Sequence, residues 1–100
     1  MVFEWDEAKR QLLIAARKID LIDAAGIFEG PVVTRTDNRR DYGEVRYISI
    51  GFVDGQCFVV VHTERDGVTR LITAWRGGRN EQLKYQAGIT GRDKGDEGAR

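Results

Sequence analysis

Apolar residues recur every three or four positions near the start of the chain, which is the spacing of a helix with one buried face. After a short extended start at residues 2–4, Asp6 is a suitable N-cap for a helix from about 7 to 17. The predicted buried stripe of this helix is Trp5, Ala8, Leu12, Ala16 and Ile19. Asp20 can cap a second helix, which ends at Gly30-Pro31 because proline cannot continue the hydrogen bonding. Its predicted buried side is Leu21, Ala24, Ala25 and Phe28.

From residue 32 the pattern becomes strand-like. Four β-rich segments follow one another, at residues 32–36, 45–53, 56–65 and 68–76, with a polar loop after the first. Asp54-Gly55 and Asp66-Gly67 separate the last three segments. An Asp-Gly pair between strands indicates a two-residue type I′ turn, because that turn needs positive φ at both positions. The pattern therefore predicts an antiparallel meander of about four strands.

The two turns fix which side chains lie opposite one another. They place Tyr47 opposite His62, and Ile50 opposite Val59 and Ala74. One face is then apolar, and we expect the first two helices to cover it; it consists of Ile48, Ile50, Phe52, Cys57, Val59, Val61, Ile72 and Ala74, with Arg46, Arg65, Arg70 and Arg76 at its charged end. The other face is expected to lie away from the core; it carries Tyr47, Ser49, Phe58, His62, Glu64, Leu71, Thr73 and Trp75.

The order of elements predicts an α+β fold in one domain over residues 1–86: two N-terminal helices packed on the meander, then one C-terminal helix. Residues 87–100 contain four glycines and mixed charge, so we expect a disordered tail whose removal leaves the domain folded. No apolar run approaches the roughly 18 residues of a membrane span, and no signal segment is evident at the start. The expected location is the cytoplasm.

Charge and cysteine content narrow the candidate chemistry. The chain has 16 basic and 16 acidic residues, so net charge does not indicate nucleic acid. Positive charge nevertheless gathers late in the chain, where Arg70, Arg76, Arg79 and Lys84 oppose only Glu81. This cluster is either a binding site for an anion or a solvated helix face. One cysteine and one histidine exclude a Cys or His metal cluster, so we expect no metal and no cofactor.

The remaining candidates suit RNA chemistry. His62 is the natural general acid or base near neutral pH, and Glu64 is an alternative base. Arg65, Arg76 and Arg79 can bind phosphates, and Tyr47 or Tyr85 can stack on bases. RNA can be cleaved without metal when a base deprotonates the 2′-hydroxyl and arginine stabilises the charge on the phosphate. The alternative for His62 is an ordinary half-buried strand histidine.

Five segments carry motifs of a known family. They are FEWDEAK at 3–9, DAAGIF at 23–28, DNRRDYGEVRYISIGFVDG at 37–55, VVVHTERDG at 59–67 and RLITAWRGGRNEQLKY at 70–85. The chain thereby resembles the BrnT toxins of bacterial type II toxin–antitoxin systems over residues 2–86. The resemblance implies a RelE-like fold, a cytoplasmic ribonuclease that inhibits translation, and neutralisation by a bound antitoxin, BrnA. That antitoxin has a ribbon-helix-helix DNA-binding part, so operator DNA would be contacted only through it.

The chain departs from the pattern of this family in three places. Residues 16–18 are Ala-Arg-Lys where the family usually has Lys-His-Gly, and Leu13 replaces a common asparagine. Trp75 replaces an arginine of the last strand, although Arg76 follows. Loss of a phosphate ligand would weaken, retarget or abolish cleavage. A partner-binding module or a single-stranded RNA binder of the same fold, without catalysis, therefore stays an alternative, and Trp75 favours the former because large aromatics anchor interfaces.

Overall fold

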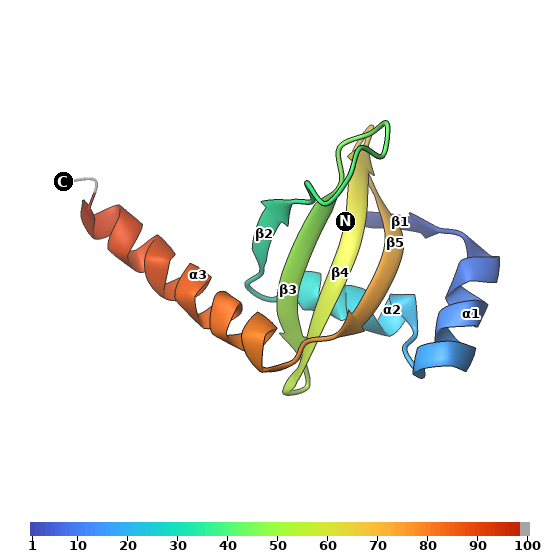
Figure 1. Ribbon diagram of the computed structural model, residues 1–100, viewed down its shortest axis with the longest axis horizontal. Helices are drawn as coiled ribbons and strands as arrows, with labels where there is room; N and C mark the ends of the chain where they lie inside the picture. Colours follow the sequence, from blue (N-terminus) through green and yellow to red (C-terminus); the bar gives the residue numbers. More distant parts are fainter. Residues whose placement is uncertain (99–100) are drawn as a thin grey trace.

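The computed structural model describes the backbone of residues 1–98 and the side chains of residues 1–91. The elements, in chain order, are β1 (Val2–Trp5), α1 (Glu7–Arg17), α2 (Leu21–Ala24), the 3-10 helix η1 (Ala25–Glu29), β2 (Val33–Thr36), β3 (Tyr47–Val53), β4 (Gln56–Arg65), β5 (Val68–Arg76) and α3 (Arg79–Gly98). The predicted α+β class is confirmed. The predicted second helix consists of α2 and η1 together, and helix α3 follows the sheet (Figure 1).

The sheet has five strands in the order β1-β5-β4-β3-β2. Strands β2 to β5 form the predicted antiparallel meander. Asp54 and Asp66 have φ of 48° and 54°, and the glycines after them have φ of 79° and 78°, as type I′ turns require. The fifth strand, β1, pairs with β5 in parallel, so the sheet is mixed. This pairing joins the two ends of the domain, and local patterns do not reveal such long-range contacts.

One bulge changes the predicted register. The pairs Tyr47–His62 and Ile50–Val59 between β3 and β4 are confirmed. Between β4 and β5 the register shifts after His62–Leu71, so that Ile72 has no partner and Val59 lies opposite Trp75. The prediction that Ala74 faces Val59 was wrong, because an extra residue in one strand reverses the faces beyond it.

The helices cover the face opposite to the predicted one. On the α2 face, Val60, Leu71 and Ala74 pack with buried residues of the N-terminal helices and of the link between α1 and α2; these are Leu13, Ile19, Leu21, Ala24, Ala25 and Ile27. On the α3 face, a second cluster consists of Ile48, Ile50, Cys57, Val59 and Val61, with Ile72, Trp75 and Tyr85 packed against it. Val59, Val60 and Val61 are all at most 1% exposed, so both faces of β4 are buried. Alternation along the strand therefore could not decide which face the first helices cover.

Helix α1 also has a different buried side from the predicted stripe. Leu13 is 4% exposed, whereas Leu12 is 65% exposed. Arg10 lies with Leu13 on the inner side of the helix. Its guanidinium donates to both carboxylate oxygens of Asp20, at 2.8 and 2.7 Å. The predicted N-caps are confirmed, because Asp6 accepts from the amide of Lys9 and Asp20 from that of Ile22.

Helix α3 projects from one edge of the sheet (Figure 1). The Tyr85 hydroxyl donates to the carbonyl of Pro31 at 3.0 Å, and Gly88 lies against Val33. The helix continues to Gly98 and so includes most of the segment predicted to be a disordered tail; residues 99 and 100 of that segment lie outside the described residues. The boundary at residue 86 stays a prediction. Within residues 1–98, no helix is long and apolar enough to cross a membrane.

Candidate active site

Five polar side chains form a continuous hydrogen-bonded chain across strands β2 to β5. Thr34 and Ser49 hydroxyls lie 2.7 Å apart, and Ser49 Oγ lies 2.7 Å from His62 Nε2. His62 Nδ1 lies 2.6 Å from Glu64 Oε2, and Thr69 donates to Glu64 Oε1 at 2.7 Å. Since an ionised carboxylate only accepts, Nδ1 donates to Glu64, and a ring that carries no second proton accepts from Ser49 at Nε2. The chain fixes the tautomer and orientation of the imidazole.

His62 is buried inside this chain, at 5% exposure. Its ring meets that of Phe28 in a T-shaped contact with centroids 5.1 Å apart, and the centre of the Tyr47 ring lies 5.7 Å from that of the imidazole. The prediction that Tyr47 and His62 lie away from the core was wrong, because Phe28 belongs to η1 and covers this face. Ser49 is fully buried, so the Ser-His-Glu order does not expose a nucleophile. Glu64, with a side chain 43% exposed, is the accessible acid of the group.

A charged pocket of about 250 Å³ lies at the same end of the sheet. Its lining is Asp6, Lys9, Glu44, Arg46, Arg70, Leu71 and Ile72. The Glu44 carboxylate accepts from Arg46 Nε at 3.1 Å and from Arg65 Nη2 at 3.2 Å. Side chains alternate along strands, so Arg46, Arg65 and Arg70 point away from the face of Tyr47, Glu64 and Leu71. The pocket thus combines two carboxylates, Asp6 and Glu44, with three cations, of which Arg46 and Arg70 point to the α3 side.

The loop between β2 and β3 is held in shape by Asp37. Its side chain, fully buried, accepts from Arg39 Nε and Nη2 at 2.8 Å each, from the Arg39 amide at 3.1 Å and from the Tyr42 hydroxyl at 3.1 Å. The bonds from Arg39 lower the pKa of Asp37 and raise that of Arg39. The Arg46 guanidinium stacks 4.2 Å from the centre of the Tyr42 ring. Asp37 therefore positions the loop that supplies Glu44.

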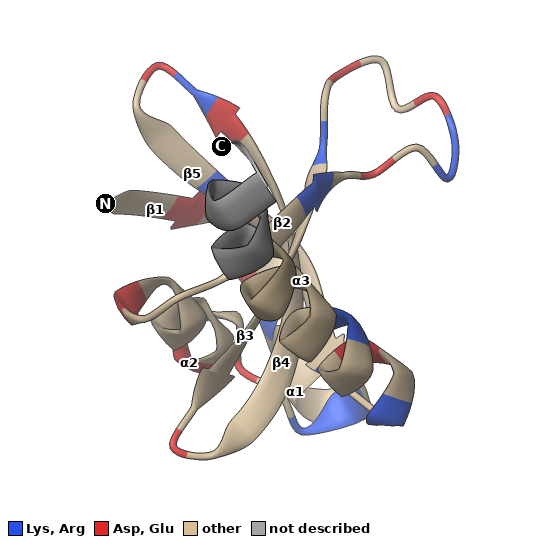
Figure 2. Cartoon of the chain, turned by 90° about the vertical axis from the view of Figure 1, so that its left-hand side faces the viewer, with Lys and Arg blue, Asp and Glu red and all other residues tan. Residues whose placement is uncertain are grey.

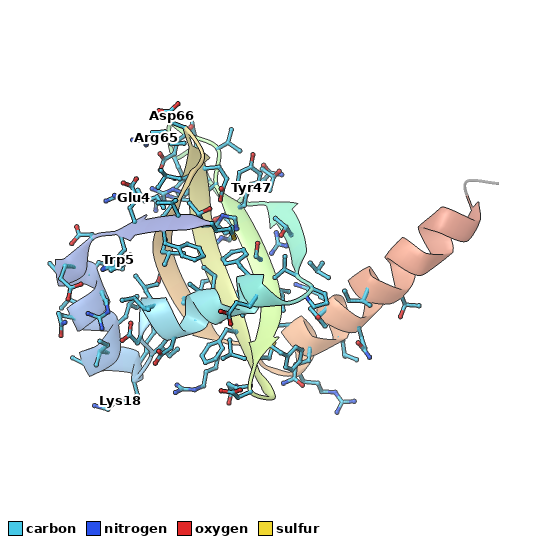
Figure 3. The ribbon with its side chains drawn as sticks, turned by 180° about the vertical axis from the view of Figure 1, so that it is seen from behind. Glu4, Trp5, Lys18, Tyr47, Arg65 and Asp66 are labelled. Carbon is cyan, nitrogen blue, oxygen red and sulfur yellow. The ribbon has the colours of Figure 1, made fainter. Side chains whose placement is uncertain are left out.

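Charges of both signs alternate along this loop (Figure 2). In the same view the loop and α2 lie on opposite sides of the sheet (Figure 2). The loop that supplies Glu44 to the charged pocket thus lies on the side of the sheet away from α2. Tyr47, on the face of His62, and Arg65, which binds Glu44, lie at the same end of the sheet (Figure 3).

The cations at the opposite end have different surroundings. Arg76 donates from Nη1 to the carbonyl of Arg17 and from Nη2 to that of Lys18, both at 3.0 Å. Arg79 is exposed beside a depression of α3 lined by Phe52, Gln82, Leu83, Tyr85 and Gln86. The ring of Tyr85 packs edge-on against Phe52 at 5.1 Å. Arg76 thus satisfies carbonyls at the end of α1, while Arg79 is available to a ligand.

The predicted site residues fall into two groups. His62, Glu64 and Tyr47 lie together, with Arg65 nearby on the other face. Arg76 pairs with Phe58 in the sheet, so it lies roughly 23 Å along β4 from Arg65. Arg79 and Tyr85 follow it on α3. One reacting phosphate cannot contact both groups.

Sequence reasoning did not select Glu44 as a site residue, nor the adjoining Arg46 and Arg70. Two signals were present: the two arginines were placed at the charged end of one face, and Glu44 belongs to the segment DYGEVR. The lone histidine drew attention to the other face. Among the residues described, no group of three or more His, Cys, Asp or Glu side chains could hold a metal ion. Burial raises the pKa of the Cys57 thiol, which makes it a poor nucleophile.

Comparison with known families agrees with the resemblance seen in the motifs. The model of a family described as the ribonuclease toxin, BrnT, of type II toxin-antitoxin system matches residues 5–81. This match includes both groups of candidate residues except Tyr85. No curated protein matches the chain.

Proposed function

This chain belongs to the BrnT family of ribonuclease toxins of type II toxin–antitoxin systems, and we propose that it cleaves RNA at the charged pocket on the α3 face. The observation that supports this location is the Glu44 carboxylate between Arg46 and Arg65, beside Lys9 and Arg70. This arrangement places a candidate base, Glu44, beside cationic side chains that can bind a phosphate, and the pocket is open to solvent. Glu64, by contrast, accepts from His62 and Thr69.

In the proposed reaction Glu44 removes the proton from a ribose 2′-hydroxyl. The 2′-oxygen attacks the adjacent phosphorus, the bond from phosphorus to the 5′-oxygen breaks, and solvent water supplies a proton to that oxygen. The products are a 2′,3′-cyclic phosphate and a 5′-hydroxyl end. Arg46, Arg65 and Arg70 stabilise the negative charge that builds on the phosphate oxygens, so the reaction needs no metal.

Glu64 supplies a matched control for Glu44. Both are glutamates at the same end of the sheet, but they lie on opposite faces, and Glu64 with His62 is the acid–base pair predicted from the sequence. We expect Glu44→Gln to lower the cleavage rate in EDTA by roughly 10²- to 10⁴-fold, and Glu64→Gln to change it by less than about threefold. Circular dichroism checks that both variants are folded. The opposite ranking would place catalysis at His62 and Glu64 and refute the pocket.

RNA beyond the reacting phosphate is proposed to follow the α3 face toward Arg79. The exposed guanidinium at the start of α3 can bind a phosphate there. Tyr85 keeps its predicted stacking role only if it leaves Phe52 and Pro31. Binding at this distance raises affinity without changing the chemical step.

The family implies an antitoxin protein as partner. We propose that it is a BrnA-like ribbon-helix-helix protein, that operator DNA is contacted only through it, and that cleavage in the cytoplasm inhibits translation. The resemblance of the motifs supports these details. Expression of the chain alone should arrest growth, and coexpression with the neighbouring gene product should relieve the arrest. Unrelieved toxicity would refute the partner.

A further inference from the structure

We propose that Trp75 and Arg39 form a nucleobase-binding site on the α3 face, linked to the charged pocket by the loop between β2 and β3. The proposal builds on RNA cleavage at that pocket. The Arg39 guanidinium carbon lies over the Trp75 ring, 5.6 Å from its centre. Guanidinium planes and aromatic rings are the groups on which unstacked RNA bases are held. The pair therefore has the composition of a stacking platform.

The platform is fixed in orientation. Asp37 holds the guanidinium of Arg39 by two parallel bonds of 2.8 Å, which is the bidentate geometry that orients a planar group. Trp75 is half-buried and packs against both buried clusters, the one of Val59 and Val61 and the one under the first helices, so its ring is held in place. The Arg39 side chain is nevertheless 52% exposed. A base can stack on this accessible guanidinium at little cost in side-chain entropy.

The platform also connects to the charged pocket. Asp37 binds Tyr42 as well as Arg39. The Arg46 guanidinium carbon in turn lies over the Tyr42 ring, 4.2 Å from its centre. Arg46 lines the pocket and binds Glu44. A base on Arg39 would thus be held by the same loop that supplies the phosphate ligands. We assign this site to a base of the nucleotide next to the scissile phosphate.

The competing interpretation is that Trp75 and Arg39 merely cover an apolar cluster. Trp75 fluorescence separates the two, because the chain has only two tryptophans. In a Trp5→Phe variant, Trp75 is the sole tryptophan. The probe is an uncleavable 2′-O-methyl RNA tetranucleotide, and its control is the same backbone without bases. The control carries equal phosphate charge, so only base stacking distinguishes the two ligands.

We expect saturable quenching of Trp75 by the tetranucleotide and binding of the abasic control weaker by roughly 5- to 150-fold. Arg39→Gln should weaken binding of the tetranucleotide by a similar factor and weaken binding of the abasic control much less. Equal affinities for the two ligands, unchanged fluorescence, or no binding would overturn the base site.

The two proposals fail separately. Glu44→Gln in the Trp5→Phe background should still show the quenching while it loses cleavage. Normal cleavage by that variant would refute the catalytic pocket and leave the stacking result standing. Lost cleavage together with equal binding of both ligands would refute only the base site.

Discussion

Arg76 is the residue for which sequence and structure lead to opposite expectations. The sequence places it in a basic cluster that could hold RNA, so Arg76→Ala should reduce toxicity and leave the fold intact. In the structure its guanidinium donates to the carbonyls of Arg17 and Lys18 at the C-terminal end of α1. Lys18 is in the left-handed conformation, with φ of 57°, and ends that helix. We therefore predict that Arg76→Ala destabilises the domain.

The size of the effect follows from these two bonds. A hydrogen bond contributes about 1 kcal/mol net, and one to a charged group somewhat more. Both bonds of Arg76 are exposed, so water can replace the lost donor and the lower value applies. A cation near the C-terminus of a helix adds a few tenths of a kcal/mol. The sum is about 2 kcal/mol, which lowers Tm by roughly 8–16 °C in a domain of this size.

Arg79→Ala is the matched control. Arg79 is also an exposed arginine, but its side chain makes no hydrogen bond or ion pair within the described part of the chain, so its loss should change stability by at most about 0.5 kcal/mol. Urea unfolding of both variants gives the free energies directly. If Arg76→Ala unfolds like the wild type but loses RNA binding, the guanidinium serves RNA and the argument from α1 is wrong.

Three further predictions concern other parts of the fold. Gly77→Ala should cost about 1–3 kcal/mol in urea unfolding, since a Cβ there would clash with the Cys57 sulfur. Gly78→Ala meets nothing nearer than 3.4 Å and should be tolerated, so equal costs for the two variants would contradict the packing. Because folding lowers the pKa of Asp37, its contribution is present above pH ~4 and lost as pH falls through the lowered value. The stability gap between wild type and Asp37→Asn should therefore narrow below pH ~4, and a constant gap would argue against the ionised pair. Deleting residues 92–100 should leave Tm within about 2 °C, because the contacts described between α3 and the sheet come from residues up to 88; a large fall would show that the segment packs.

The meander could be predicted from the sequence because its determinants are local. Two Asp-Gly turns fix β3, β4 and β5 within a few residues of each turn, and the observed bounds of β4 and β5 equal the predicted ones. Helix capping by Asp6 and Asp20 is local in the same sense. The parallel pairing of β1 with β5 is not local. Four residues of β1 meet a strand more than 60 positions later, and no turn specifies that contact.

The assignment of faces failed for two separate reasons. Val59, Val60 and Val61 are buried together, so the central strand is apolar on both sides and gives the helices no preference. The bulge at Ile72 then moves Trp75 from the face of His62 to the face of Val59. A single unpaired residue has no mark in the sequence, yet it decides which side chains Trp75 meets. Its contact with Arg39 could not have been predicted.

The surroundings of His62 show which contacts the strand register alone can predict. The confirmed pairing of β3 with β4 puts Ser49, His62 and Glu64 on one face, so their hydrogen-bonded order was implied by the turns. The strand register does not reveal that Phe28 of η1 covers this face of the sheet. A histidine satisfied on both nitrogens and covered by an aromatic ring stabilises the sheet. Our proposal of Glu44 as the base rests instead on its place among arginines, which can bind the phosphate while the carboxylate faces the 2′-hydroxyl.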